Sequence, residues 1–410
     1  MVDIPGLPAR RAALKMGDAV VRRGDTLDQA AGAAMQHLRA APDRALARAI
    51  AGEVLRWLTD FDAMIDSATR QRLPDDAKAR AVLRMMLAQW LRLDTPPHAV
   101  IATALPLLAG GPRRLAHGVF SALVKRDGGL PPAPTLPEPV IARWGERAGA
   151  IAAALAEPPP LDLTLKDHGE TAAWAERLGG VSLMPGHVRV ARGRAVEELP
   201  GFDEGAWWVQ DLAASLPARL LGMGEGRSVL DLCAAPGGKT MQLAAAGWRV
   251  TALDMSARRC DRLRQNLART GLIADVVTAD ALEWQPAEPF DAVLLDAPCT
   301  ATGTCRRHPD VLHRIGQRQI DELADLQVRL LARAATFLKP GGALVYATCS
   351  LEAAEGERVV GTCTLSPDPV SSEDLPTGIA PTTQGHVRTD PAMLADQGGL
   401  DGFFIARWRA

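Results

Sequence analysis

The stretch Leu230–Thr240 reads LDLCAAPGGKT and decides the fold of the second half of the chain. It begins as an apolar strand, passes through a glycine turn and opens a helix at Lys239. Two later runs, Ala292–Leu295 and Ala343–Tyr346, are short and apolar, as buried strands are. From Trp207 onward, strand and helix patterns alternate, which predicts an open, mostly parallel sheet with helices on both faces.

The expected strands of this part are 228–232, 249–254, 274–279, 291–296, 343–348 and 402–408. The expected helices are 239–246, 257–270, 317–338 and 352–360. Residues 361–399 are rich in Pro, Ser, Thr, Asp and Gly without periodicity, so we expect a long surface excursion there.

Two cysteines follow the two later strands. Cys299 ends the sequence DAPC that starts at Asp296, and Cys349 lies between Thr348 and Ser350. Carboxyl ends of parallel strands share one edge of a sheet, where such sheets bind ligands. We therefore expect both thiols to open onto the same site as the glycine loop. Thiols beside a cofactor loop suggest covalent chemistry on an electrophilic carbon.

The glycine loop has the chemistry of an anion site, because it joins a strand to the N-terminus of a helix. It matches neither GxxxxGK[ST] nor GxGxxG. Asp254, at the end of the next strand, can accept both hydroxyls of a ribose, and Asp280 can accept from an adenine amino group. Each feature alone is more often ordinary turn chemistry. Together, at successive strand ends, they favour an adenosine cofactor with a small anionic end, such as S-adenosylmethionine.

Composition excludes several classes of protein. Of the 410 residues, 47% are hydrophobic and 23% are charged, which argues against global disorder. No apolar run reaches the roughly 18 residues of a membrane span, and charges interrupt the N-terminus where a signal segment would lie. The six cysteines show no paired metal spacing. We expect a cytoplasmic protein without a metal site, a disulfide framework or a membrane partner.

Charge is unevenly distributed along the chain. Residues 1–130 hold 19 Lys and Arg against 13 Asp and Glu, whereas the remainder holds 27 against 35. A basic surface that binds a polyanion and an ordinary solvated surface explain this asymmetry equally well. Charge alone leaves that choice open.

The chain divides into three expected parts. Residues 1–130 are predicted to be all helical, with helices at 12–23, 26–40, 45–59, 75–93, 98–108 and 113–125. Residues 131–205 begin with a proline-rich linker and continue as a small α/β adaptor, with helices at 140–155 and 172–178 and a strand at 161–165. Residues 206–410 form the strand–helix part.

Three stretches resemble the motifs of a known family. Leu230–Thr240, Phe290–Asp310 and Leu344–Ser350 resemble those of RNA (cytosine-5)-methyltransferases of the Sun/Fmu type, which methylate small-subunit ribosomal RNA. Residues 6–126 resemble the NusB-like RNA-binding domain of these enzymes. The resemblance implies a multidomain protein with an all-α NusB-like domain, a small α/β adaptor and a Rossmann-like methyltransferase domain. After Ser350 the family continues with a proline and an acidic–asparagine pair, whereas this chain has EAAEG at 352–356.

The resemblance also implies roles for individual residues. Cys349 is the implied nucleophile that adds to carbon 6 of cytosine, and Cys299 assists release of the methylated RNA. Asp296 contacts the edge of the base, and Lys239 lowers a thiol pKa or touches the base. The implied cofactor-binding residues lie in the glycine loop and at the strand ends: Cys233, Ala234, Ala235, Pro236, Gly237, Gly238, Lys239, Asp254, Asp280 and Asp296.

The expected function is therefore S-adenosylmethionine-dependent methylation of carbon 5 of a cytosine in RNA, with 16S ribosomal RNA as the favoured substrate. We expect a monomer whose partner is RNA. Transfer RNA is the rival substrate within this enzyme class. A non-catalytic RNA-binding ribosome assembly factor is the rival from another class, and the cysteine pair argues against it. A dehydrogenase is a more distant alternative, because the dinucleotide fingerprint is missing.

Overall fold

The computed structural model describes residues 5–126 and 128–410, which fold into two compact units. The helical unit contains the described residues up to Glu157 together with Cys305–Ile315, and the sheet unit contains Pro158–Thr304 and Gly316–Ala410. Residues 1–4 and 127 of the expected first domain lie outside the described residues. The boundaries expected after residues 130 and 205 stay predictions.

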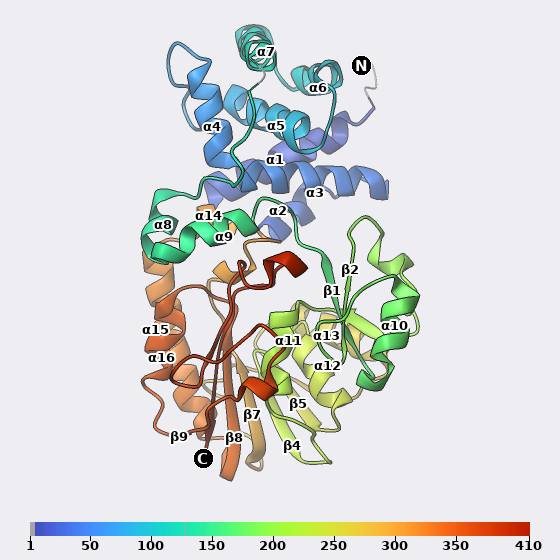
Figure 1. The fold of residues 1–410 in the computed structure, drawn as a ribbon, viewed down its shortest axis with the longest axis vertical. Coiled ribbons are helices and arrows are strands. Elements are labelled where there is room, and N and C mark those ends of the chain that lie inside the picture. Colours follow the sequence, from blue (N-terminus) through green and yellow to red (C-terminus); the bar gives the residue numbers. More distant parts are fainter. Residues whose placement is uncertain (1–4, 127) are drawn as a thin grey trace. The chain divides into compact units, whose positions relative to one another are not determined.

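The helical unit is built from amphipathic helices, drawn in blue to green in Figure 1 apart from the last one in the chain, which is orange. They are α1 Leu7–Arg23, α2 Leu27–Ala34, α3 Ala41–Arg56, α4 Leu58–Ser67, α5 Lys78–Arg92, α6 Pro97–Ala104, α7 Gly110–Lys125, α8 Glu138–Trp144, α9 Ala148–Ala154 and α14 Val311–Arg314. Their apolar stripes meet in a core that includes Met16, Phe61, Met86 and Phe120. An all-α first domain was expected, and it is confirmed.

Two expected helices are each divided in the structure. The helix expected over 45–59 is α3 followed by α4, which meet at Trp57 in a non-helical conformation. The helix expected over 140–155 is α8 and α9, separated at Gly145, whose φ of 57° ends α8. Alanine-rich sequence carries a helical pattern through both breaks, so the pattern alone did not mark them.

The segment Cys305–Ile315 belongs to the helical unit although it continues the sequence motif around Cys299. The Arg56 side chain donates a 2.8 Å hydrogen bond to the carbonyl of Arg306, and a ring nitrogen of His313 lies 2.6 Å from the carbonyl of Leu55. The apolar residues of α14 are buried as well. The chain therefore leaves the sheet unit after Thr304 and returns to it at Gly316.

The sheet unit begins with a small antiparallel sheet of order β2-β1-β3, formed by β1 Leu161–Leu165, β2 His187–Val190 and β3 Trp207–Val209, with helix α10 Thr171–Leu178. A buried ion pair crosses it, because Arg189 binds both carboxylate oxygens of Asp162 at 2.6 and 2.8 Å. Burial would raise the pKa of Asp162, but these hydrogen bonds outweigh it and hold the pKa well below its usual range.

The main sheet has the order β10-β11-β8-β7-β4-β5-β6, with β9 beside β11. Its strands are β4 Ser228–Leu232, β5 Arg249–Asp254, β6 Asp275–Thr278, β7 Phe290–Asp296, β8 Leu338–Thr348, β9 Ser366–Pro367, β10 Val387–Arg388 and β11 Phe404–Arg409. Strands β6, β5, β4, β7 and β8 are parallel, whereas β11 runs antiparallel to β8. The expected Rossmann-like arrangement is confirmed.

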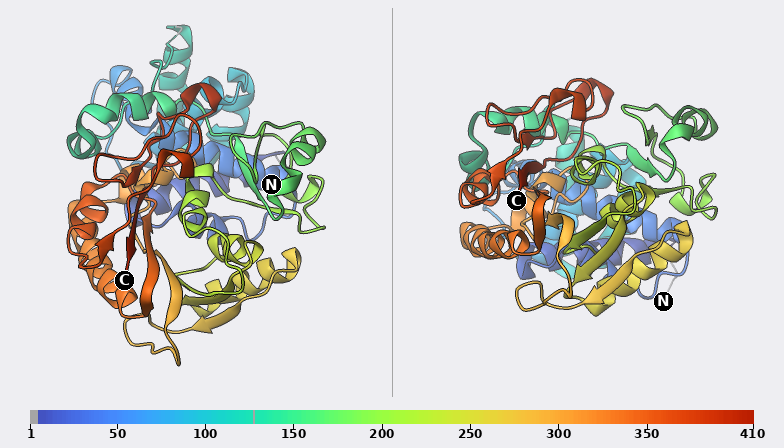
Figure 2. Two further views of the ribbon diagram at one scale, coloured as in Figure 1. Left: turned by 60° about the horizontal axis from the view of Figure 1, so that its bottom comes forward. Right: turned by 90° about the horizontal axis from the view of Figure 1, so that it is seen from below.

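Both faces of this sheet are buried, which explains its uninterrupted apolar strands. On β7, Ala292 and Leu294 pack on one face, while Val293 and Leu295 pack on the other. Helices α11 Leu212–Arg219 and α12 Gly238–Ala245 cover the first face, and α15 Gln317–Ala335 and α16 Glu357–Val360 cover the second. Figure 2 shows the strands between these layers from two further directions.

Two expectations for the C-terminal region were wrong in detail. Helix α15 ends at Ala335 rather than 338, and the strand expected to begin at 343 begins at Leu338, so β8 includes Pro340, Gly341 and Gly342. The region 361–399 is more than a surface excursion, because Val370, Leu375 and Ile379 are buried against the first face of the sheet. Short strands and turns there follow no period that sequence inspection detects.

Strand order places the site. The chain enters the sheet at β4, builds outward through β5 and β6, and then returns to the opposite side of β4 with β7. This reversal is a topological switch point, where open α/β sheets bind ligands beyond the carboxyl ends of the strands. The glycine loop follows β4 and the Asp296–Cys299 loop follows β7, so they flank the switch point.

Candidate active site

The two cysteines that follow β7 and β8 lie side by side. Their Sγ atoms are 3.4 Å apart. Asp296 pairs with Ala347 across the two parallel strands, so Cys299 and Cys349 leave adjacent strand ends at nearly the same level. Contact with Cys349, together with burial, raises the pKa of Cys299 well above its usual value. Cys299 is therefore held as a neutral thiol beside Cys349.

Backbone packing fixes the two cysteine loops to each other. The amide of Gly303 donates a 3.0 Å hydrogen bond to the carbonyl of Cys349, and the amide of Gly402 donates to Gly303. A Cβ atom at Gly303 would lie 1.9 Å from the carbonyl oxygen of Gly402 and 2.9 Å from that of Cys349. Only glycine allows this approach, which brings three chain segments together next to the thiols.

Lys239 and Asp296 form an ion pair across the switch point. Lys239 Nζ donates to Asp296 Oδ2 at 2.7 Å, and the ammonium also lies over the Phe403 ring, 5.3 Å from its centroid. Burial opposes the charge of Lys239, but the Asp296 carboxylate outweighs it, so the pKa of Lys239 is raised. The Cys349 thiol contributes in the same direction. A fixed cation therefore interacts with the Cys349 thiol.

The glycine loop turns sharply from β4 into α12. Gly237 has a φ of 105°, and its amide donates to the carbonyl of Ala234. Ala234 itself donates to the carbonyl of Leu253 on β5, which ties the loop to the neighbouring strand. Cys233 lies at the start of this turn, and burial raises the pKa of its thiol to about 12. Cys233 therefore contributes shape to the loop rather than a nucleophile.

Asp254 is a buried carboxylate at the end of β5. Its Oδ2 accepts from the amide of Ala235 at 3.2 Å and its Oδ1 from the amide of Ser256 at 3.0 Å. Arg259 lies 3.4 Å away and also donates to the carbonyl of Ala235. Asp254 thus holds the glycine loop in place with the same oxygens that were predicted to bind a ribose, each of which can accept a second hydrogen bond.

Asp280 stands apart from this group. It follows the end of β6 at Thr278, is exposed, and accepts a hydrogen bond from the amide of Leu282 in its own turn. Among the predicted site residues, the structure thus joins Lys239, Asp296, Cys299 and Cys349 directly. It also links the glycine loop to Asp254, and it leaves Asp280 without a contact to either group among the described residues.

Asp231 fits a cationic group of the predicted cofactor. It is fully buried on β4, its Oδ2 accepts from Thr240 at 2.6 Å, and its Oδ1 has no hydrogen-bond partner in the described part of the chain. Burial raises the pKa of Asp231 to about 7. An ammonium donor such as the amino group of S-adenosylmethionine would satisfy this oxygen and favour its ionised form. The loop residues present therefore fit that cofactor.

We expect replacement of Asp254 by alanine to weaken S-adenosylmethionine binding by about 30- to 150-fold. Hydrogen bonds to a charged acceptor are worth roughly 2–3 kcal/mol, and the substitution also releases the amide of Ala235 in the glycine loop and that of Ser256 after β5. Titration calorimetry measures the affinity. Asp275→Ala is the matched control, because Asp275 begins β6 at the end of the strand away from Asp254. This variant should bind S-adenosylmethionine normally. Unchanged affinity of the Asp254 variant would remove it from the cofactor site.

Glu355 is a site residue that sequence inspection missed. It is completely buried, and its carboxylate accepts four hydrogen bonds. Two come from the amide and hydroxyl of Thr300, one from the Ser350 hydroxyl and one from the Gln327 side chain, at 2.9, 2.5, 2.5 and 3.1 Å. Thr300 follows Cys299 and Ser350 follows Cys349. One carboxylate therefore braces both cysteine loops.

The sequence signal for Glu355 is weak. The stretch 352–356 lacks the proline and asparagine of the family pattern but retains acidic residues. Burial raises the pKa of Glu355, and its four donors act against that shift. An acidic residue placed a few positions after a motif carries no information about its partners until the fold brings Thr300 to it.

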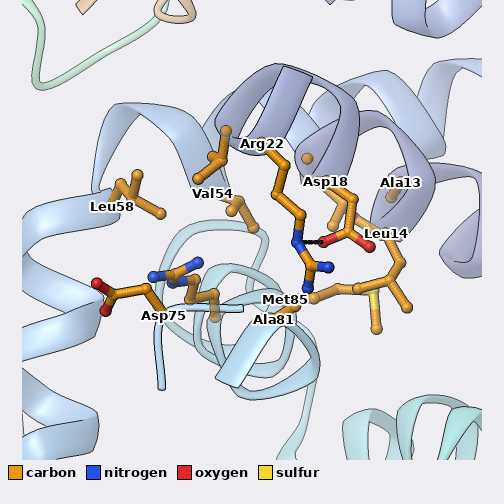
Figure 3. A pocket seen from close by; sticks show the side chains of 13 residues that line it. Ala13, Leu14, Asp18, Arg22, Val54, Leu58, Asp75, Ala81 and Met85 are labelled. Atoms are coloured by element: carbon orange, nitrogen blue, oxygen red, sulfur yellow. Dashed lines mark ion pairs between the residues drawn. The ribbon is translucent and has the colours of Figure 1, made fainter. Parts of the chain in front are cut away.

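A separate small pocket lies within the helical unit, between α1, α3 and α5 (Figure 3). Its volume is about 30 Å³, and apolar side chains such as Leu14, Val54 and Met85 form most of its wall. Arg22 and Asp18 form a 3.5 Å ion pair beside them, drawn as a dashed line. The pocket has room for little more than water and none of the predicted site residues lines it, so we assign it no chemistry.

Both parts of the chain match known protein families. Residues 218–409 match the family described as 16S rRNA methyltransferase RsmB/F, and residues 7–109 match the NusB family. A ribosomal RNA small subunit methyltransferase B of Xylella fastidiosa is 34% identical, over 98% of this chain and 98% of the relative. A protein of the same name from Pseudomonas syringae is 34% identical over 89% of each chain.

Solved structures share the fold. A methyltransferase homologue from Pyrococcus horikoshii is 28% identical, covers 66% of this chain and 93% of its own, and has a TM-score of 0.54. The NSun6 protein of the same organism covers 67% of this chain and 98% of its own with a TM-score of 0.58 at 19% identity, a likeness that concerns the fold alone. No helix among the described residues is long and apolar enough to cross a membrane.

Proposed function

Because the chain belongs to the family of 16S ribosomal RNA methyltransferases B and F, we propose that it methylates carbon 5 of a cytosine in 16S ribosomal RNA. S-adenosylmethionine is the cofactor of this reaction. The observation that carries the proposal is the thiol pair, 3.4 Å apart, next to the Lys239–Asp296 ion pair and the glycine loop. The relatives match nearly the whole chain, so the proposal extends to both units.

The chemistry explains why a thiol is needed. Carbon 5 of cytosine is a poor nucleophile until a thiolate adds to carbon 6 and converts the ring to an enamine. We assign this addition to Cys349, which lies near the Lys239 ammonium, because a nearby cation stabilises a thiolate. Bound S-adenosylmethionine supplies an electrophilic methyl group for carbon 5. Loss of the carbon-5 proton then breaks the bond to Cys349 and restores the ring.

Asp296 and Cys299 are assigned the steps before and after methylation. Asp296 lies at the switch point and can hydrogen-bond the polar edge of the cytosine ring, which helps the addition. Cys299, a neutral thiol in contact with Cys349, is placed to act on the covalent adduct during release. In this assignment Lys239 serves twice, as the partner of Asp296 and as the cation near the nucleophile.

RNA is the proposed macromolecular partner, and the NusB-like part of the chain is its proposed anchor. Helices of this part hold the basic excess of the sequence, and phosphate contacts from Lys and Arg supply sequence-independent affinity. We further propose that the protein acts as a monomer in the cytoplasm and requires no metal.

Bisulfite sequencing of RNA from a deletion strain tests the proposal. One cytosine of 16S ribosomal RNA should lose its protection almost completely, and a plasmid copy of the wild-type gene should restore it. The Cys349→Ala gene is the matched control and should restore nothing. Loss of a site in transfer RNA instead would identify the rival substrate. Unchanged methylation throughout would favour a non-catalytic assembly factor.

A further inference from the structure

A second concave surface adjoins the glycine loop within the sheet unit. It is a groove of about 470 Å³, in the size range of sites that hold nucleotide-sized molecules. The loop contributes Pro236 and Gly238 to its wall, so the groove and the predicted cofactor site share one loop. Apolar side chains come from β3 of the small antiparallel sheet and from the segment before it, among them Val209 and Phe202, and Val209 is 47% exposed.

Helix α13, Ala257–Thr270, supplies the polar wall. Residues 262, 265, 266 and 269 line the groove, and this spacing puts them on one stripe of the helix. Two of them are structural. Asn266 donates to the carbonyl of Pro236 at 2.8 Å, and Arg269 donates to the carbonyls of Phe202 and Trp207. The stripe is thereby fixed to both the loop and the small sheet.

Arg262 is the second arginine of this stripe, and its guanidinium is available to a ligand. It is exposed and makes no hydrogen bond or ion pair with any described residue. The helix as a whole carries five arginines and one aspartate, Asp261, which already pairs with Arg264 at 3.0 Å. Glu197 is the one carboxylate in the described groove wall, and it comes from the small sheet's side. An anion in the groove is therefore favoured on the α13 side.

We propose that this groove binds the single-stranded RNA next to the target cytosine, with a backbone phosphate on Arg262 and a base against the apolar wall. A nucleotide combines a flat base with an anionic phosphate. The apolar wall of the groove can pack against the base, and Arg262 on the α13 wall can bind the phosphate. The shared loop places the occupant next to the cofactor site. This inference rests on the proposed function and adds a second RNA contact, separate from the NusB-like part.

The test compares two substitutions that remove the same charge from the same helix. Arg262→Ala removes one positive charge from the groove wall, whereas Arg264→Ala removes one positive charge from a position of α13 outside the groove. Binding of an unmodified 16S ribosomal RNA transcript by the full-length protein is measured over a salt series. Arg262→Ala should weaken binding roughly three- to tenfold and reduce the slope of log K against log salt by about 0.7, the loss of one phosphate contact to a single strand. Arg264→Ala should leave the slope unchanged.

Three other results would each overturn the inference. They are equal slopes for both variants, an effect of Arg264→Ala alone, and a loss of S-adenosylmethionine affinity by Arg262→Ala with normal RNA binding. The last result would assign the groove to the cofactor. Wild-type methylation of the transcript is measured in parallel. If it occurs while the slopes are equal, the groove assignment fails and the proposed function stands.

Discussion

Replacement of Cys349 by alanine should abolish methyl transfer, with a loss of at least about 10⁴-fold in kcat, because no thiolate remains to activate carbon 5. Cofactor affinity should stay within a few-fold of wild type, since Cys349 lies beyond β8 and the glycine loop follows β4. Single-turnover methylation of unmodified 16S ribosomal RNA measures the first quantity and calorimetry the second.

The matched substitution Cys299→Ala should have the opposite signature. Addition by Cys349 proceeds, but release from carbon 6 fails, so a covalent RNA–protein adduct accumulates. The adduct survives denaturing electrophoresis and disappears in the double variant that also lacks Cys349. If Cys299→Ala turned over normally and Cys349→Ala formed the adduct, the two roles would be reversed.

The sheet and its edge could be predicted from sequence because their physical signals are local. Apolar runs of strand length alternate with helical patterns, and a buried parallel sheet requires apolar residues on both faces of β7 and β8. Strand ends then bring loops together wherever the strands are neighbours. The 3.4 Å contact between Cys299 and Cys349 is a direct consequence of the β7–β8 pairing.

The features that sequence inspection missed depend on contacts between distant segments. Cys305–Ile315 continues the Cys299 motif, yet its packing partners are helices of the first unit, about 250 residues earlier in the case of Arg56 and Arg306. The 361–399 region packs through isolated apolar residues such as Val370 and Ile379 that follow no period. The position of Asp254 at a strand end predicts a role in the site. Its hydrogen bond with the amide of Ala235 could not be predicted, because it depends on the conformation of the glycine loop.

Glu355→Gln should lower kcat by about 10- to 100-fold while leaving the affinities for S-adenosylmethionine and RNA nearly unchanged. The amide keeps the volume of the carboxylate but replaces one acceptor oxygen with a donor, where the hydroxyls of Thr300 and Ser350 both donate. The cysteine loops then lose their common brace. A shift of about 1 Å in reacting groups costs on the order of 100-fold in rate. Thermal unfolding controls for a merely structural loss.

Two smaller substitutions each remove one hydroxyl bond to Glu355, one from each cysteine loop. They distinguish a positioning role of Glu355 from general destabilisation. Ser350→Ala removes the hydroxyl bond from the Cys349 side to Glu355 while leaving both Thr300 bonds to that carboxylate, so it should mainly slow formation of the adduct in the Cys299→Ala background. Thr300→Val removes the hydroxyl bond on the Cys299 side while keeping the amide bond, so it should slow release and make some adduct visible in an otherwise wild-type protein. Identical behaviour of the two variants, in proportion to their melting temperatures, would show that Glu355 only stabilises the fold. Opposite effects on addition and release would place Glu355 as the residue that sets the geometry of both thiols.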